Sequence, residues 1–493
     1  MRAVRWLKAA GPVAVAAVAV LVAAGSAYAG PVSVKPAVPH AAPVAGSYPP
    51  SPQDWPAYLD GPSHWSYNSA DKAITRAEVP ELTNKWHFGT GQEFLASPTV
   101  ADGSVFIGSP DGTFYKLNEV TGHIQARYYI GQQSPPGCEP WGVIDTATVA
   151  ADPVTHQQMV YVGGPDGYLY ALTEANLTLK WKSVVALPTP GKHTYFDWSS
   201  PTVSHGNIYI GVSSYCNVPF IRGAVIGYNQ STGQKAGEFY TVPAGHVGAS
   251  IWSSVAVSPS GYVYASSGNG PDSDPTLGYS ESIIKLTPAT LNLADSFQVP
   301  ADQVTTDGDF GASPSYFGNF VGACNKNGIF YALISSTMTV AWQARIGAAS
   351  DAVPHANCLA TPVYNGKDLF FAGPEVTING RVYRGSVQER NAATGALIWE
   401  TGLPNGVIGS PTMNGAGVLA VGTFDYTNSA NYTYLINAAT GKIIRTLVRG
   451  MDFAQSVWAD GWLFTANSDG VYAWGPKGKS NRPTNVPRLR AGR

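Results

Sequence analysis

The chain is poor in charge and lacks several motifs that would assign a function at once. Only 13% of its 493 residues are charged, and 30 Lys and Arg against 32 Asp and Glu give a formal net charge of -2. Nucleic-acid binding needs a clustered basic face, so this balance argues against it. A Cys-x-x-Cys-His motif is absent, which excludes a c-type haem attached at such a motif. There is also no nucleophile-elbow motif or Ser-His-Asp spacing to indicate a hydrolase.

Long apolar runs are missing except at the N-terminus. Residues 1–29 place three basic residues before an apolar run at residues 11–25 and end in the small-x-small sequence of residues 27–29. This pattern is typical of a secretory signal peptide. No later run is long enough to span a bilayer. We therefore expect a secreted or otherwise extracytoplasmic protein with no membrane span after cleavage; an uncleaved anchor is the alternative.

A repeat dominates the rest of the chain. Each unit begins with a sequence like Ser97-Pro98-Thr99-Val100, continues through short β-branched and aromatic strands, and often has a Thr-Gly turn before a strand that carries tryptophan. The unit returns at intervals of 46 to 60 residues, near Thr146, Ser200, Ser253, Ser313, Thr361, Ser410 and Ser456. Four short strands per unit at this spacing are typical of propeller blades. The sequence therefore predicts an all-β fold, an eight-bladed β-propeller of four-stranded antiparallel blades.

The two ends of the repeat region complement each other. The last unit ends near Trp474 without an outer strand, whereas residues 82–88 form a spare strand before the first unit. We expect this N-terminal strand to complete the last blade, which removes exposed sheet edges. Tryptophans on the outer strands, such as Trp181 and Trp342, should lie between adjacent blades.

The expected organisation is a signal peptide at 1–29, a Pro/Ala-rich linker at 30–52, a propeller at 53–475 and a basic disordered tail at 476–493.

Four cysteines, Cys138, Cys216, Cys324 and Cys358, are present. An even number in an exported chain favours two disulfides over free thiols. Two of them lie in long loops of early units and two in consecutive later units, which favours pairing Cys138 with Cys216 and Cys324 with Cys358. The sequence alone leaves the connectivity open.

Function must be read from residues that interrupt the repeat, because the repeat itself supplies only the scaffold. The fourth and fifth units are the most irregular. Their interruptions are, in order, Gly248 to Trp252, Ser267-Gly268-Asn269-Gly270, Asp307-Gly308-Asp309-Phe310-Gly311 and Asn325-Lys326-Asn327-Gly328. This order resembles the pyrroloquinoline quinone (PQQ) dehydrogenases, or quinoproteins, over Asp54 to Trp474. Val212-Ser213-Ser214, Arg222-Gly223 and Asp309-Phe310-Gly311 look most like the polyvinyl-alcohol-dehydrogenase-like branch.

The resemblance implies an exported dehydrogenase that oxidises a small or polymeric alcohol with PQQ and calcium at the channel mouth and passes electrons to an external acceptor. A flat anionic quinone needs an aromatic floor, cations and a hard oxygen-ligated ion, and a carboxylate can take the alcohol proton. The implied roles are Trp252 for stacking, Lys326 for the quinone carboxylates, Asn269 for calcium, Asp307 or Asp309 as the base, Glu93 as a cofactor-facing glutamate and Arg222 as a second carboxylate contact.

The chain also departs from the family pattern. Many members place two adjacent cysteines above the quinone, where this chain has only Cys138. The calcium-ligating glutamate of the third blade is missing, unless Asp197, Glu139 or Asn217 replaces it. Each candidate also has a structural interpretation, with Trp252 as an aromatic packed between blades and the polar residues as turn residues. The alternative function is therefore a non-catalytic propeller that binds a protein or an extracellular polymer.

Overall fold

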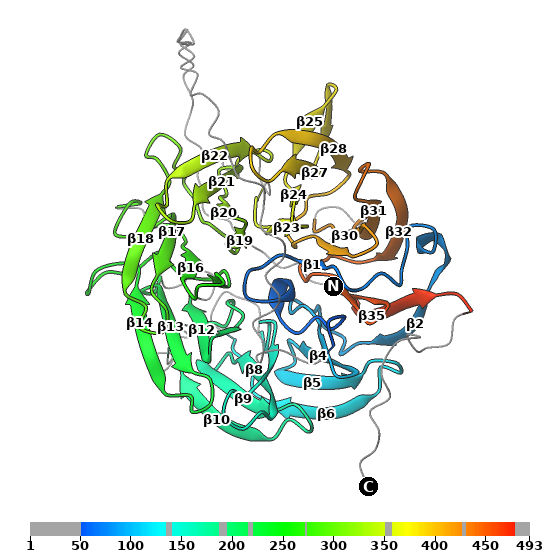
Figure 1. The fold of residues 1–493 in the computed structure, drawn as a ribbon, viewed down its shortest axis with the longest axis horizontal. Coiled ribbons are helices and arrows are strands. Elements are labelled where there is room, and N and C mark those ends of the chain that lie inside the picture. Colours follow the sequence, from blue (N-terminus) through cyan, green and yellow to red (C-terminus); the bar gives the residue numbers. More distant parts are fainter. Residues whose placement is uncertain are drawn as a thin grey trace.

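The structure is a computed structural model that describes residues 51–134, 141–186, 195–214, 220–271, 274–350, 357–425 and 430–478. Within these ranges it contains eight sheets of four antiparallel strands arranged around a common centre (Figure 1). This arrangement confirms the predicted eight-bladed propeller. None of the helical segments in the described ranges could span a bilayer. The predicted signal peptide and nearly all of the predicted linker and tail lie outside these ranges.

The blades follow one another along the chain, and each runs from an inner to an outer strand. Blade 1 contains β3 (Thr99–Ala101), β4 (Ser104–Gly108), β5 (Thr113–Asn118) and β6 (Ile124–Tyr129). Blade 2 contains β7 (Thr148–Ala151), β8 (Gln158–Gly163), β9 (Tyr168–Thr173) and β10 (Leu179–Val184). Blade 3 contains β11 (Thr202–Ser204), β12 (Asn207–Val212), β13 (Ala224–Asn229) and β14 (Lys235–Tyr240). Blade 4 contains β15 (Ala256–Val257), β16 (Val263–Ser266), β17 (Ser282–Leu286) and β18 (Leu293–Gln298).

The later blades follow the same plan with two additions. Blade 5 contains β19 (Ser315–Phe317), β20 (Phe320–Cys324), β21 (Ile329–Ile334) and β22 (Val340–Arg345). Blade 6 contains β23 (Val363–Tyr364), β24 (Asp368–Gly373), β27 (Gly385–Asn391) and β28 (Leu397–Leu403), with an inserted hairpin of β25 (Val376–Ile378) and β26 (Arg381–Tyr383). Blade 7 contains β29 (Thr412–Asn414), β30 (Val418–Gly422), β31 (Tyr432–Asn437) and β32 (Ile443–Arg449), joined by the short parallel strand β1 (Tyr67–Asn68). Blade 8 contains β33 (Val457–Ala459), β34 (Trp462–Asn467), β35 (Gly470–Pro476) and β2 (Leu82–Phe88).

The N-terminal strand closes the ring. β2 pairs antiparallel with β35, from Leu82 opposite Pro476 to Phe88 opposite Val471. This pairing confirms that the N-terminal strand completes the last blade. It also removes two sheet edges that would otherwise be open for aggregation.

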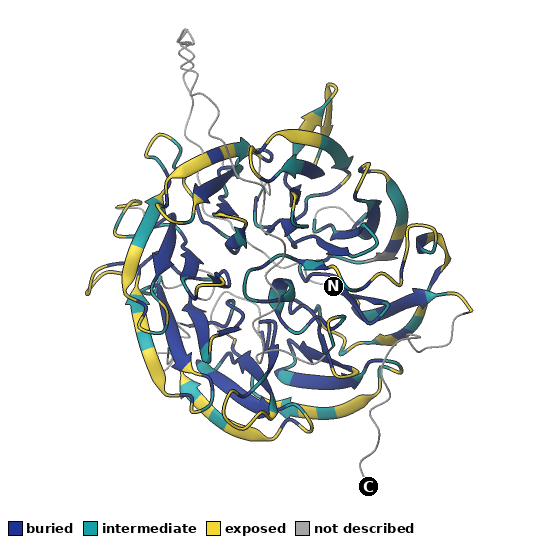
Figure 2. Cartoon of the chain, in the orientation of Figure 1, coloured by how far each residue is buried: buried dark blue, intermediate teal, exposed yellow. Residues whose placement is uncertain are grey.

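Burial explains the strand pattern. The three inner strands of a blade lie between neighbouring blades and are buried along most of their length, whereas outer strands such as β6, β10 and β14 have repeated exposed positions (Figure 2). Inner strands therefore need side chains that pack on both faces, and only the outer strands can alternate between apolar and polar residues.

The repeat signature forms a ring of hydrogen bonds between blades. A hydroxyl at the first position of the signature accepts the backbone N–H of the corresponding residue in the preceding blade; we call these contacts the hydroxyl ring. The donors and acceptors are Ser97 to Thr146 (3.0 Å), Thr146 to Ser200, Ser200 to Ser254, Ser254 to Ser313, Thr361 to Ser410 and Gln455 to Ser97 (each 2.9 Å). The last of these bonds joins blade 8 to blade 1. The threonine of the signature adds bonds to the next blade, from Thr99 to Ala147 O (2.7 Å), Thr148 to Pro201 O (2.6 Å) and Thr202 to Val255 O (2.7 Å).

Tryptophans of the outer strands lie between blades, as predicted. Each indole packs on the glycine of the Thr-Gly turn in the next blade, where a Cβ would come within 2.5 to 2.7 Å of the ring. The pairs are Trp86 with Gly122, Trp181 with Gly233, Trp342 with Gly395 and Trp399 with Gly441. Only glycine leaves room for this contact, which explains the recurrence of Thr-Gly in the sequence.

A segment that sequence analysis did not identify occupies the centre of the ring. Residues 53–69, here called the strap, make backbone hydrogen bonds to the inner strands of blades 1, 2, 4, 5, 6, 7 and 8. The bonds include Trp55 with Val100, Val149 to Pro56, Val257 to Pro62, Tyr316 to Ser63, Tyr364 to Trp65, Met413 to Ser66 and Asp460 to Gln53. Its short helical turn η1 (Tyr58–Asp60) is the blue coil at the centre of Figure 1.

The hydroxyl ring gives the first prediction. Thr146→Val keeps the side-chain shape but leaves the buried N–H of Ser97 without its acceptor, which should lower the free energy of unfolding by about 1 to 3 kcal/mol. Thr337→Val is the control, because Thr337 is exposed and its hydroxyl meets only Thr339. Denaturant titrations would measure both. Equal stability of the two variants would contradict a stabilising role for the ring.

The strap gives a prediction about pH. Burial, reinforced by the negative charge of Asp460, raises the pKa of Asp54 to about 9, against about 4 in an unfolded chain. The folded protein therefore holds a proton that the unfolded chain releases, so the contribution of Asp54 to stability is fully present below about pH 4 and is lost as the pH rises towards 9. Asp54→Asn should reduce this fall, whereas Asp274→Asn at an exposed position should not. Parallel pH dependence in all three proteins would disprove the assignment.

Candidate functional site

Five of the predicted residues come from loops at one end of blades 4 and 5. Trp252 precedes the inner strand β15, and Asn269 follows β16. Asp307 and Asp309 lie in the loop before the inner strand β19, and Lys326 lies in the turn between β20 and β21. In a propeller these positions share one end of the ring, so residues up to 74 positions apart in the sequence come together.

Lys326 is the centre of this group. Its Nζ lies 2.8 Å from Asp307 Oδ2 and 2.7 Å from Asp309 Oδ2. The second oxygen of Asp309 accepts the backbone N–H of Asn269 at 2.7 Å. The ammonium group also lies 5.8 Å from the centroid of a Trp252 ring. We call these five residues the lysine–aspartate cluster.

The two aspartates differ in environment. The side chain of Asp309 is 7% exposed and that of Asp307 is 38% exposed. Burial would raise the pKa of Asp309, but the Lys326 ammonium and the hydrogen bonds outweigh it and lower that pKa. Burial is also the largest influence on Asp307, and here it keeps the pKa raised despite Lys326. Asp307 is therefore better suited to receive a proton, whereas Asp309 is fixed as a charged anchor.

Glycines allow the cluster to be compact. A Cβ on Gly311 would lie 2.5 Å from the Trp252 indole, so this ring packs directly on the backbone of the Asp-Phe-Gly segment. A Cβ on Gly308 would likewise collide with the carboxylate of Glu281. Both contacts explain why glycine alternates with aspartate and phenylalanine in this loop.

Glu281 belongs to the same region and was missed by sequence reasoning. It is 2% exposed, its φ of 46° is left-handed, and neither carboxylate oxygen has a hydrogen-bond partner. Burial, and then the negative charge of Asp309, raises its pKa to about 8. The signal available in the sequence was an acidic residue at the entrance to the apolar strand β17.

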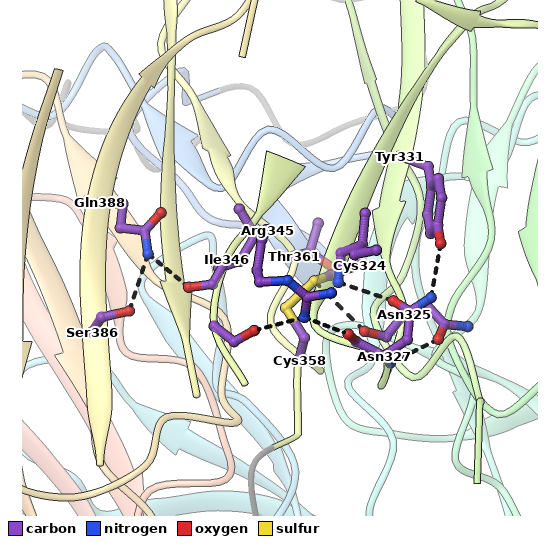
Figure 3. The surroundings of a disulfide bond; sticks show 12 residues. Cys324, Asn325, Asn327, Tyr331, Arg345, Ile346, Cys358, Thr361, Ser386 and Gln388 are labelled. Carbon is purple, nitrogen blue, oxygen red and sulfur yellow. Dashed lines mark hydrogen bonds between the residues drawn. A yellow bond between two sulfur atoms is a disulfide. The ribbon is translucent and has the colours of Figure 1, made fainter. Parts of the chain in front are cut away.

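A disulfide supports the turn that carries Lys326. Cys324 at the end of β20 is bonded to Cys358, and both residues are buried (Figure 3). Asn325 donates to Gly308 O, and Arg345 donates to Asn327 O at 3.0 Å. The later disulfide is thus confirmed. Cys138 and Cys216, the other predicted pair, lie outside the described residues.

Two predicted residues are not part of the cluster. The guanidinium of Arg222 lies 3.9 Å from the centroid of the Tyr240 ring, and its Nε donates to Val242 O. Glu93 lies in the loop between β2 of blade 8 and β3 of blade 1, where burial raises its pKa to about 7, and its charge acts on Asp452 in the loop between blades 7 and 8. The structure therefore gives neither residue a contact with Lys326.

The described residues offer few ligands for the predicted calcium ion. Within the described ranges, no group of three or more His, Cys, Asp or Glu side chains is arranged to hold a metal ion. Of the residues that could replace the missing glutamate, Glu139 and Asn217 are outside those ranges. Asp197 is fully buried between blades 2 and 3, close to Asp145.

A family model and several solved structures are similar to this chain. The family model for outer membrane protein assembly factor BamB matches residues 135–279. The quinohemoprotein alcohol dehydrogenase structure from Comamonas testosteroni has a TM-score of 0.66 at 16% identity and covers 88% of this chain and 82% of its own. A europium-containing methanol dehydrogenase has a TM-score of 0.67 at 13% identity, over 86% and 98% of the two chains. The chain has the fold of the PQQ-dependent dehydrogenases.

Two curated proteins also resemble this quinoprotein-like propeller. Lupanine 17-hydroxylase [cytochrome c] from Pseudomonas sp is 28% identical over 192 residues, which cover 38% of this chain and 26% of that protein. A quinohemoprotein alcohol dehydrogenase from Pseudomonas putida is 27% identical over 175 residues, which cover 35% and 23%. The match spans about a quarter of each relative, so these similarities support the family of folds and leave the activity to be tested.

The cluster predicts a specific loss of stability. Lys326→Met removes the charge that keeps Asp307 and Asp309 ionised side by side, which should cost about 3 kcal/mol near neutral pH. Acidification should restore part of this loss, because one aspartate can then be protonated. Lys235→Met is the control, since its ion pair with Glu238 is exposed and should contribute less than about 1 kcal/mol. Chemical denaturation at two pH values would test both variants, and an equal, pH-independent loss would contradict the assignment.

Proposed function

We propose that this chain is an exported quinoprotein-type dehydrogenase that oxidises an alcohol with PQQ bound beside the lysine–aspartate cluster. The observation that carries the proposal is the contact of Lys326 with both Asp307 and Asp309 next to Trp252. These are the residue types that an anionic aromatic cofactor and an alcohol substrate require. The shared fold and the disulfide are consistent with it.

Each residue has a distinct role in the proposal. The indole of Trp252 supplies an aromatic face for stacking. An ammonium group has three N–H donors, so Lys326 keeps one for a carboxylate or carbonyl of the cofactor after binding the two aspartates. Asp307 takes the hydroxyl proton of the alcohol, because it is more exposed than Asp309 and burial raises its pKa, whereas that of Asp309 is lowered. The bound quinone would supply the acceptor for the hydride from the alcohol carbon.

Bound calcium at Asn269 is part of the proposal, but it is assigned no step in the reaction. Asn269 offers only a neutral side-chain amide to an ion, and its Nδ2 donates to Gly270 O at 3.2 Å. Calcium usually has six to eight oxygen ligands, and the described residues around Asn269 do not supply them. The electron acceptor, the extracytoplasmic location and the choice between a small and a polymeric alcohol are likewise part of the proposal.

A quinone titration tests the proposal. PQQ, with and without calcium, is added to the purified mature chain, and tryptophan fluorescence and dye-linked alcohol oxidation are followed. Trp252→Ala and Lys326→Ala should each weaken binding by about 1 to 3 kcal/mol. Asp307→Asn should retain binding and lose turnover. Arg222→Ala is the matched control, because its guanidinium contacts Tyr240 instead of the cluster.

The outcome separates the two candidate functions. Binding that depends on Trp252 and Lys326 but not on Arg222 supports the dehydrogenase. If the wild-type chain does not bind PQQ in the presence of calcium, the enzyme proposal fails. A non-catalytic propeller that binds a protein or an extracellular polymer then becomes the working hypothesis.

A further inference from the structure

A cleft lies between blades 2 and 3 at the outside of the propeller, separate from the lysine–aspartate cluster. One wall is the end of β10, and the other is formed by β13 and β14 of the next blade (Figure 1). Its volume is about 430 Å³, within the range of about 300 to 1,000 Å³ that is usual for ligand pockets. Lys235 and Tyr240, the first and last residues of β14, both line it. A strand of this length spans about 20 Å, so the cleft is elongated.

Three side chains of β14 bring hydrogen-bonding groups to the cleft. Lys235 Nζ lies 2.8 Å from Glu238 Oε2, and the Tyr240 hydroxyl donates to the same oxygen at 3.3 Å. Among the described residues, no donor bonds to Glu238 Oε1. An ammonium group has three N–H donors, so Lys235 keeps two for other partners. The cleft can therefore donate hydrogen bonds to a ligand and also accept them from it.

The charges of this pair cancel. The hydrogen bond between the two side chains is the largest influence on both, and it lowers the pKa of Glu238 and raises that of Lys235. Both groups therefore stay charged around neutral pH. One positive and one negative charge side by side give the pair no net charge, which favours a neutral ligand with hydroxyl groups.

Apolar surface lies beside these polar groups. The Tyr240 side chain is partly exposed at 39%, and Val184 on the β10 wall is 45% exposed. The guanidinium of Arg222 lies over the Tyr240 ring, 3.9 Å from its centroid, and is itself held by the bond from Nε to Val242 O at 2.8 Å. The ring is thus fixed in orientation before a ligand arrives. A sugar ring has a matching division, with C–H groups on its faces and hydroxyls around its edge, and C–H faces pack on aromatic rings.

The cleft between blades 5 and 6 shows a different use of the same strand positions. Glu400 is paired in register with Gln388 there, as Glu238 is with Ile226 in blade 3. Gln388 Nε2 donates to Glu400 Oε1 at 2.8 Å and to Ile346 O at 2.7 Å, and that cleft is smaller, about 280 Å³. Ile226 cannot make such a bond. The carboxylate of blade 6 is therefore engaged within the protein, whereas the one of blade 3 remains available to a ligand.

We propose that the cleft between blades 2 and 3 binds a neutral polysaccharide chain. The chain lies along β14, with one sugar ring packed on Tyr240 and hydroxyls bonded to Glu238 Oε1 and Lys235 Nζ. An extended chain suits the cleft because the lining residues follow the whole strand. The site is independent of quinone binding and of the proposed dehydrogenase activity, since none of the cluster residues lines it.

Affinity electrophoresis of defined variants tests the site. The purified mature chain is run through native gels that contain soluble amylose, mixed-linkage β-glucan, galactomannan or arabinoxylan, and dissociation constants are derived from the retardation. Polygalacturonate and poly(vinyl alcohol) gels are the comparison probes, because one adds negative charge and the other lacks sugar rings. The variants are Tyr240→Ala, Tyr240→Phe and Glu238→Ala. Tyr129→Ala is the matched control, since Tyr129 ends the outer strand β6 as Tyr240 ends β14 and is exposed at 67%.

At least one neutral polysaccharide should retard the wild type and Tyr129→Ala equally. Tyr240→Ala and Glu238→Ala should each bind it at least about tenfold more weakly, whereas Tyr240→Phe, which keeps the ring, should retain most of the affinity. Thermal unfolding would show whether each variant is folded, and Glu238→Ala decides the question if Tyr240→Ala is not. No retardation of the wild type by any of the four neutral polysaccharides would overturn the proposal. Unchanged binding by Tyr240→Ala and Glu238→Ala would do the same, as would binding to polygalacturonate or poly(vinyl alcohol) alone.

Discussion

The hydroxyl ring is the constraint on which the rest of the structure depends. At six of the eight interfaces a blade cannot shift along its neighbour without breaking a bond between a backbone N–H and a hydroxyl of the next blade, as between Ser97 and Thr146. These groups are buried, so a broken bond would leave an unsatisfied donor with no water to replace the acceptor. The ring therefore fixes the relative height of the blades, and with it the loops that carry Trp252, Asp309 and Lys326.

Three further interactions hold the blades in the same arrangement, at different distances from the propeller axis. The strap holds the inner strands from the centre, and the outer tryptophans on their glycines hold the rim. β2 joins the first described part of the chain to the last blade. Because these contacts are independent of the site, loops on one end can vary in sequence while the scaffold stays the same. This separation is why the fold is shared with proteins at 13 to 16% identity.

The sequence predicted the scaffold well because its signals are local and repeated. Ser-Pro-Thr-Val, Thr-Gly and the outer tryptophan each mark a contact that recurs around the ring, and the tryptophan contact with Thr-Gly occurs at four interfaces. The resemblance to quinoproteins also predicted residues that come together, with Lys326 between Asp307 and Asp309. Arg222 shows the limit of that reasoning, since residue type and order do not fix the direction in which a long side chain points.

The features that were missed depend on contacts between distant segments. The strap lacks the alternation of apolar and polar residues that marks a strand. Its hydrogen bonds run to parts of the chain up to about four hundred residues away, as between Gln53 and Asp460. The environment of Glu281 depends on Gly308, which lies against it, and that of Asp145 depends on Asp197. Both partners are distant in the sequence. Such pairs depend on how blades are placed in space, and a single sequence contains no local signal for that placement.

The pairing of β2 with β35 also determines the order in which the molecule can be completed. β2 precedes every blade in the chain, yet its partner β35 is made about four hundred residues later. Until then β2 has no strand partner in blade 8, and the ring stays open. Contacts of such high sequence separation slow folding, because a long loop must close before they form. The early blades must therefore remain soluble as an incomplete ring until the final strands arrive.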